Sequence, residues 1–194
     1  MSRQSISCTN TAKLIRQALK EAFAGVKFSV RSHVYAGGAS IIVEWHDGPN
    51  VAQVETVTGR FEASYFDGMI DYKGAIYHML DGQPVRFGAD FIRCNRRHSK
   101  EATGRAIARV YRSLAHHFEG CGMDCPTVEQ YEKGELLAVE IGGRDLNREI
   151  RNALAKSSDR LAGKPSKTAG RVFVTHDDGY SRAVGSGMAA VSHD

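Results

Sequence analysis

The chain has 194 residues, a formal net charge of +4 and an apolar content of 42%. This length fits one domain with an appendage or two small domains, and so mild a charge excludes a strongly basic nucleic-acid coat protein. No apolar stretch is long enough to cross a membrane, and the first residues lack the apolar core of a signal peptide. The four cysteines do not form the framework of a small secreted domain, so we expect a cytoplasmic protein.

The first part of the chain predicts a helix, a β-hairpin and a second helix. Residues 1–8 are expected to form a loose arm. An apolar face then predicts a helix that ends near Gly25, with Leu14, Ile15, Ala18, Leu19, Ala22 and Phe23 on that face. Alternating side chains predict strands over residues 26–35 and 41–45, joined by a glycine turn. Pro49 suits the first turn of the next helix.

The middle of the chain repeats this order. Residues 59–72 are expected to form a connector, and residues 75–80 and 84–94 a second hairpin. A helix over residues 100–117 closes a core domain that spans residues 11–118. The predicted order is α-β-β-α-β-β-α, which is typical of an α+β fold with an antiparallel sheet and helices on one face.

Residues 120–194 predict a smaller β/α extension of the core domain. We expect a strand over residues 135–141, a helix over residues 145–155 and a linker over residues 157–170. A last hairpin is predicted from residues 171–175 and 180–184.

The helix over residues 100–117 has two faces of different character. Ser99 is a suitable N-cap, and Ile107, Val110 and Leu114 lie on an apolar stripe that we expect to pack on the sheet. A second stripe is basic, and the two residues before the helix add to it: we predict an anion-binding surface from Arg96, Arg97, Arg105, Arg109 and Arg112. The alternative is an ordinary solvated helix face.

Charge changes sign along the sequence. Residues 86–112 hold eight basic and two acidic residues, whereas residues 119–140 hold six acidic residues and one Lys. The acidic stretch would repel a nucleic acid and therefore favours a protein partner.

One cluster has side chains that zinc prefers. His116, Cys121 and Cys125 have a spacing that can bring nitrogen and sulfur ligands together. The second Cys/His pair of a zinc finger or ribbon is missing, so two reduced thiols in a polar loop are the preferred interpretation. We expect no cofactor and no tightly bound zinc. We expect Asp67 and Asp71 to belong to a turn anchored by buried Met69 and Ile70.

Five motifs together resemble one known family. They are Ala12–Lys20, Val26–Ser32, Trp45-x-Asp47-Gly48-Pro49, Ser64-x-Phe66-Asp67-Gly68-Met69-Ile70-Asp71 and Phe87–Ile92. The chain is similar over about residues 11–118 to the large polyvalent protein-associated domain of class twenty-nine. The resemblance implies carriage on phages, plasmids or integrative elements, in proteins thought to help the element resist host defences. It implies no known reaction and no catalytic residues.

Three functional hypotheses follow from the motifs and the charge pattern. The first is a non-enzymatic accessory protein that acts in the bacterial cytoplasm. It would bind and block a host defence protein or ribonucleoprotein complex, such as a CRISPR effector or a restriction enzyme. The second is a DNA- or RNA-binding module that uses the basic helix, and the third is a small metal-dependent hydrolase. The oligomeric state stays open.

Overall fold

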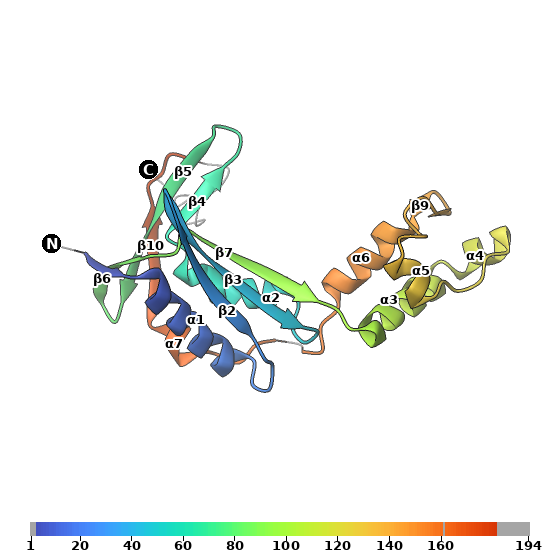
Figure 1. Cartoon of the computed structure of the whole chain (residues 1–194), viewed down its shortest axis with the longest axis horizontal. Coiled ribbons are helices and arrows are strands. Elements are labelled where there is room, and N and C mark those ends of the chain that lie inside the picture. Colours follow the sequence, from blue (N-terminus) through green and yellow to red (C-terminus); the bar gives the residue numbers. More distant parts are fainter. Residues whose placement is uncertain (1–2, 161, 182–194) are drawn as a thin grey trace, which may run out of the picture. The chain divides into compact units, whose positions relative to one another are not determined.

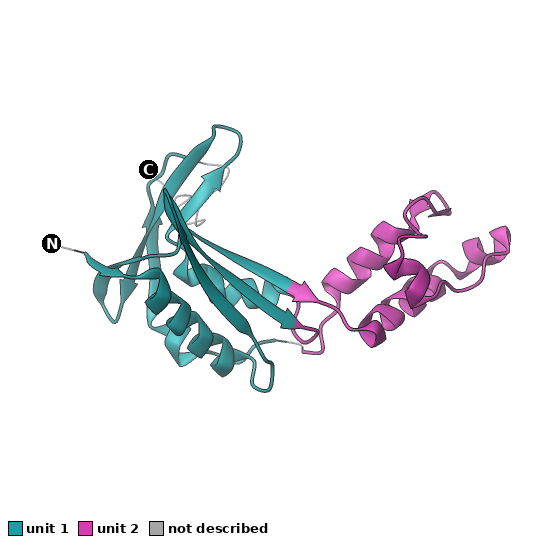
Figure 2. Cartoon of the chain, viewed as in Figure 1, with its two compact units in different colours: residues 1–45, 51–95, 162–194 teal, residues 46–50, 96–161 magenta. Residues whose placement is uncertain are grey.

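The computed structural model describes residues 3–160 and 162–181, and these divide into two compact units (Figure 2). Unit 1 consists of residues 1–45, 51–95 and 162–194, and unit 2 of residues 46–50 and 96–161. With 38% helix and 30% strand, the chain confirms the predicted α+β class. The units do not follow the expected domains 11–118 and 120–194, because the predicted basic helix falls in unit 2 and the last strand in unit 1.

Two sheets contain most strands of the chain (Figure 1). In the smaller, β3 (Gly38–His46) lies between β2 (Ser29–Tyr35), which is antiparallel to it, and β7 (Phe91–Arg97). The larger has the order β1 (Gln4–Ile6), β6 (Gln83–Phe87), β5 (Tyr72–Leu80), β10 (Val172–Asp177), and β4 (Ser64–Asp67) also pairs with β5. β1 and β6 run parallel, whereas the pairs that involve β5 are antiparallel.

The helices of unit 1 bury a core rich in aromatic residues. α1 (Cys8–Ala22) begins at Ser7, whose hydroxyl accepts the N–H of Asn10, and it contacts α2 (Val51–Thr58), β2 and α7 (Lys167–Gly170). The 3₁₀ turn η1 (Gly59–Phe61) follows α2. The largest fully buried side chains of this core are Phe23, Trp45, Phe61 and Phe87.

A half-buried carboxylate on α1 connects α1 to α7. The Glu21 carboxylate accepts hydrogen bonds from the Ser166 hydroxyl and from the N–H and hydroxyl of Thr168, at 2.7–2.9 Å. These bonds, above all the one from the Thr168 N–H, lower the pKa of Glu21 to about 2. The segment before β10 is therefore fixed to the first helix across 145 residues of sequence.

Unit 2 consists mainly of helices. Its elements are α3 (Lys100–Ser113), α4 (Ala115–Cys121), α5 (Val128–Glu132), β8 (Glu140–Ile141), β9 (Arg144–Asp145) and α6 (Leu146–Lys156). α3 packs against α6, and Ile107, Val110 and Leu114 share a core with Ile150 and Leu154. The apolar stripe is thus buried as predicted, but its partner is a helix and not the sheet.

Several predicted elements differ in extent. The helix expected over residues 100–117 is interrupted at Leu114, where α3 ends and α4 begins. The strand expected over residues 135–141 is mostly turn, with only β8 extended, and the connector 59–72 contains β4. The expected arm contains β1. Of the expected last hairpin, β10 pairs with β5 instead, and residues 182–184 lie outside the described residues.

The strand expected over residues 84–94 is divided between the two sheets. Gly88 lies so close to the arm that a Cβ there would approach the Cys8 nitrogen to 2.6 Å and the Ile6 oxygen to 2.7 Å. Two residues later the Asp90 N–H donates to the Ala39 oxygen at 2.8 Å. These contacts with distant segments end β6 and direct β7 to β3, so no single antiparallel sheet forms.

Leu114→Asp tests the helical core of unit 2. Leu114 is 5% exposed, so the substitution buries a carboxylate among apolar side chains and should lower the free energy of unfolding by about 3 kcal/mol or more. Ala108→Asp places the same group on the exposed side of the same helix and is the control. Denaturant unfolding measures both; equal midpoints for Leu114→Asp and the parent would disprove the assigned face.

His78 should make unit 1 sensitive to acid. It is 2% exposed and lies edge-on to Phe87, and burial lowers its pKa to about 4. The unfolded chain has an ordinary histidine pKa near 6.5, so it binds the proton first as the pH falls. Stability is therefore lost between about pH 6.5 and 4, by up to about 1.4 kcal/mol per pH unit. Unfolding free energies of the parent and of His78→Leu across this range should diverge, the variant falling less steeply; parallel curves would contradict this.

Candidate functional site

The predicted basic stripe lies on the exposed side of α3. Ser99 is the N-cap, as expected: its hydroxyl accepts the Ala102 N–H at 3.1 Å. Because Ile107 and Val110 are buried, the positions on the opposite side face solvent. We call this exposed set the arginine face and define it as Arg105, Arg109 and Arg112.

The guanidinium groups of the arginine face are mostly uncommitted. Arg112 donates from Nε to the Ala108 oxygen of its own helix at 3.2 Å. Hydrogen bonds from its own backbone N–H and from Ser99 lower the pKa of Glu101, and the nearby charge of Arg105 adds a smaller lowering. Within residues 3–160 and 162–181, neither Arg105 nor Arg109 forms a salt bridge. Three arginines on successive turns can therefore donate bidentate hydrogen bonds to carboxylates or phosphates.

Arg96 has a structural position and does not join the arginine face. Its guanidinium donates to four backbone oxygens: Asp47 at 3.0 Å, Gly48 at 3.0 Å, Leu154 at 3.3 Å and Ser157 at 2.6 Å. We call this cluster the Arg96 clamp. It satisfies carbonyls at the end of α6 and in the turn before α2. The Arg96 guanidinium is therefore hydrogen-bonded to backbone oxygens, whereas the neighbouring Arg97 is exposed.

The metal candidates are not gathered by the fold. His116 is exposed on α4, Cys121 directs its Sγ to the Phe118 oxygen at 3.4 Å, and Cys125 directs its Sγ to the Pro126 oxygen at 3.8 Å. In the part of the chain that the structure describes, no three His, Cys, Asp or Glu side chains come together as metal ligands.

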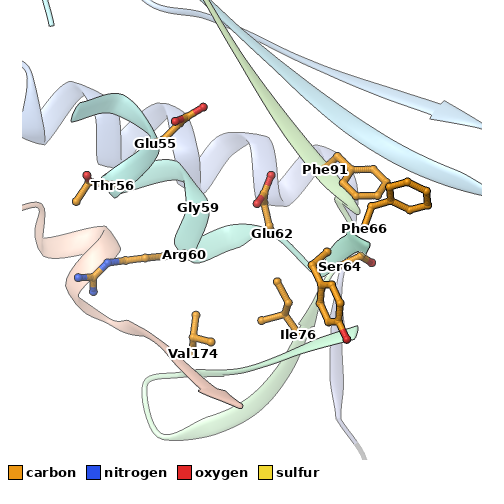
Figure 3. Close-up of a pocket in the computed structure, with 11 residues that line it drawn as sticks. Glu55, Thr56, Gly59, Arg60, Glu62, Ser64, Phe66, Ile76, Phe91 and Val174 are labelled. Atoms are coloured by element: carbon orange, nitrogen blue, oxygen red, sulfur yellow. The ribbon is translucent and has the colours of Figure 1, made fainter. Parts of the chain in front are cut away.

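Unit 1 contains a pocket that no sequence motif predicts (Figure 3). It has a volume of about 530 Å³ and lies beside α2, η1, β4 and β10. Its polar lining includes Glu55, Arg60 and Glu62, and its apolar lining includes Phe66 and Phe91. These residues come from separate stretches of the sequence, so no local motif could indicate them.

The β4 side of the pocket is held by the segment that follows β10. Asp178 accepts hydrogen bonds from the hydroxyls of Tyr65 at 2.5 Å and Tyr72 at 2.9 Å and from the Ala75 N–H at 2.7 Å. Burial and the bond to Asp178 raise the pKa of Tyr65 to about 12. Tyr65, a pocket residue, is therefore a fixed hydrogen-bond donor at neutral pH.

The turn after β4 differs from the expected anchored turn. Asp67 is buried as an acceptor: its carboxylate bonds the Met69 N–H at 2.9 Å and the Ser181 hydroxyl. Met69 and Ile70 are instead 87% and 58% exposed, so the expected buried anchor is wrong. Asp67 closes the turn itself, which leaves the two apolar side chains free to point outward.

Part of the chain is similar to a known protein family. Residues 6–99 match the family model of large polyvalent protein associated domain 29. This confirms the resemblance, since all five motifs lie inside the match. The family is associated with polyvalent proteins of phages and mobile elements. No curated protein and no solved structure gives a significant match. The arginine face lies beyond the matched residues, whereas the pocket, except for Val174, lies within them.

None of the helices in residues 3–160 and 162–181 combines the length and the apolar character that crossing a bilayer demands.

Arg96→Ala should destabilise unit 2. Removing the guanidinium leaves four partly buried carbonyl oxygens without their donor, which we expect to cost about 3 kcal/mol of unfolding free energy. Arg93→Ala removes an exposed arginine and should change stability by less than about 0.5 kcal/mol. Thermal and denaturant unfolding measure both; an Arg96→Ala protein as stable as Arg93→Ala would show that the clamp is dispensable.

Proposed function

We propose that this chain is an accessory protein of a phage or other mobile element that counters a nucleic-acid-targeting defence of its bacterial host. It acts in the host cytoplasm by binding a component of the defence, such as a CRISPR effector complex or a restriction enzyme, and blocking its active surface. The observation that carries the proposal is the arginine face, with the family match of residues 6–99 supplying the mobile-element context.

A binding role is favoured over a catalytic one by the chemistry of the arginine face. Guanidinium groups keep their charge at any physiological pH and match the geometry of carboxylates and phosphates, but they are poor proton donors or nucleophiles. The apolar side of α3 is buried against α6, so the arginines extend from a helix whose position is fixed by packing. The proposed function needs no cofactor.

A protein partner is favoured by the acidic residues of the same unit. Exposed carboxylates on α4, on α5 and in the turns that follow include Glu119, Glu129, Glu132 and Glu135. Lys100 neutralises only part of this charge, through a salt bridge to Glu132 at 3.5 Å. A uniformly anionic nucleic acid would be repelled here, while a protein with a surface of both signs would be matched.

Direct binding to DNA or RNA is the second candidate function. Arg105 and Arg109 lie one helical turn apart, about 6 Å along the axis, so both can reach phosphates of one nucleic-acid strand. Affinity for labelled DNA and RNA across a salt series separates the two candidates. A nucleic-acid binder should lose affinity steeply as salt rises, with a slope set by the number of phosphates contacted.

Reversing Arg105, Arg109 and Arg112 to Glu should leave the fold intact and abolish the activity. Exposed charges contribute little to stability, so circular dichroism and melting should match the parent. Partner capture and protection of a phage or plasmid in a host with active defence should fall by more than about tenfold.

A control with the same change of charge is available in unit 1. Arg31, Arg86 and Arg93 are exposed there, and reversing these three should leave protection unchanged. Full protection by the folded α3 variant would exclude the arginine face, and equal loss in both variants would show that only net charge matters.

A further inference from the structure

The pocket of unit 1 has the properties of a ligand site. Its volume of about 530 Å³ lies in the range of small-molecule sites, and its lining combines charged and polar side chains with apolar ones. Figure 3 shows Glu62 between the ring pair Phe66 and Phe91 on one side and Arg60 on the other. A ligand entering the pocket therefore meets rings and a carboxylate together.

Two aromatic rings line one end of the pocket. Phe66 keeps 48% of its surface exposed although it belongs to a strand, and Phe91 is half-buried at the start of β7. The Phe91 ring already has a cation near its face, because Lys73 Nζ lies 5.7 Å from the ring centroid. Lys73 is held there by Asp90 at 2.7 Å. Ring faces of this kind attract flat or compact cations.

Glu62 adds a carboxylate with one oxygen committed. Its Oε1 accepts the Ile92 N–H at 2.8 Å, which fixes the side chain at the pocket wall. Burial raises the pKa of Glu62, and the nearby Glu55 carboxylate adds to this rise. A half-buried carboxylate next to a second carboxylate would be stabilised by a bound cation.

We propose that this pocket binds a guanidinium or ammonium group, which lies against Phe66 and Phe91 and is hydrogen-bonded by Glu62. The group belongs either to a free amine or amino acid, or to an Arg or Lys side chain of a protein. Anions are disfavoured beside Glu62 because its carboxylate and that of the nearby Glu55 repel them. Arg60, a basic residue of the lining, can donate an additional bond to the carboxylate of a free amino acid, which a peptide side chain lacks.

This inference is independent of the proposed function. The pocket lies in unit 1 and the arginine face in unit 2, and they favour charges of opposite sign. The pocket can therefore be tested with small probes on the intact chain, and either proposal can fail without the other.

The test uses three probes and nuclear magnetic resonance of the isotope-labelled full chain. Agmatine represents a free guanidinium, arginine adds a carboxylate, and a short acetylated, amidated peptide with a central Arg represents a protein side chain. Adenosine monophosphate is the anionic comparison. We expect saturable shifts of the Glu62, Phe66 and Phe91 signals with at least one cationic probe and none with the nucleotide. Binding of agmatine points to a free ligand, and binding of the peptide alone points to a protein side chain.

Substitutions test whether the side chains of the pocket cause the binding of the cationic probes. Glu62→Gln keeps the shape and an acceptor but removes the charge, and should weaken the cationic probe by about tenfold or more. Glu119→Gln, on α4 of unit 2, is the matched control and should have no effect. If Glu62→Gln does not fold, Phe66→Ala changes an exposed ring and should weaken binding similarly. Unchanged affinity in the folded variant, absence of binding by all three cationic probes, or preference for the nucleotide overturns the proposal.

Discussion

The Arg96 clamp is the interaction on which unit 2 depends. Residues 46–50 belong to this unit although some 45 residues separate them from the rest of it, and the guanidinium of Arg96 connects their carbonyls to the end of α6. Asp47 extends the connection, since its Oδ1 accepts the Ser99 N–H at 3.0 Å, directly before α3. One half-buried cation thus fixes the start of α3 and the end of α6, and the packing of these two helices sets which side of α3 faces solvent.

The two candidate surfaces differ in the charge that they accept. The arginine face presents guanidinium groups from the outer side of a packed helix and suits carboxylates or phosphates. The pocket places the half-buried Glu62 carboxylate beside two phenyl rings and suits a cation. A chain with both can engage a protein surface of mixed charge, or bind a partner through one surface and a small ligand through the other. The family match covers nearly all of the pocket lining, whereas the arginine face lies beyond the matched residues.

Local signals in the sequence predicted the elements well and their partners poorly. The apolar face of α1, the hairpin of β2 and β3 and the Ser99 cap all arise within a few residues, and the structure contains them. The apolar stripe of α3 was evident, but a stripe does not specify whether a sheet or a helix covers it. The local sequence predicts that Arg96 belongs to the binding surface. It does not reveal the Arg96 clamp, because the carbonyl partners of Arg96 lie 48–61 residues away. The pocket could not be predicted from the sequence for the same reason, since its lining residues range from Glu55 to Val174.

Photo-crosslinking from the centre of the arginine face tests the account most directly. Ala108 is exposed on the same side of α3, and a benzoylphenylalanine at this position would add reach without removing an arginine. The protein would be irradiated in host cells with an active defence, with the same probe at exposed Lys27 of unit 1 as the reference. The account predicts a crosslink from position 108 to a protein of the defence machinery, identified by mass spectrometry, and none from position 27. Crosslinks to that protein from position 27 alone, or to nucleic acid alone from position 108, would contradict it.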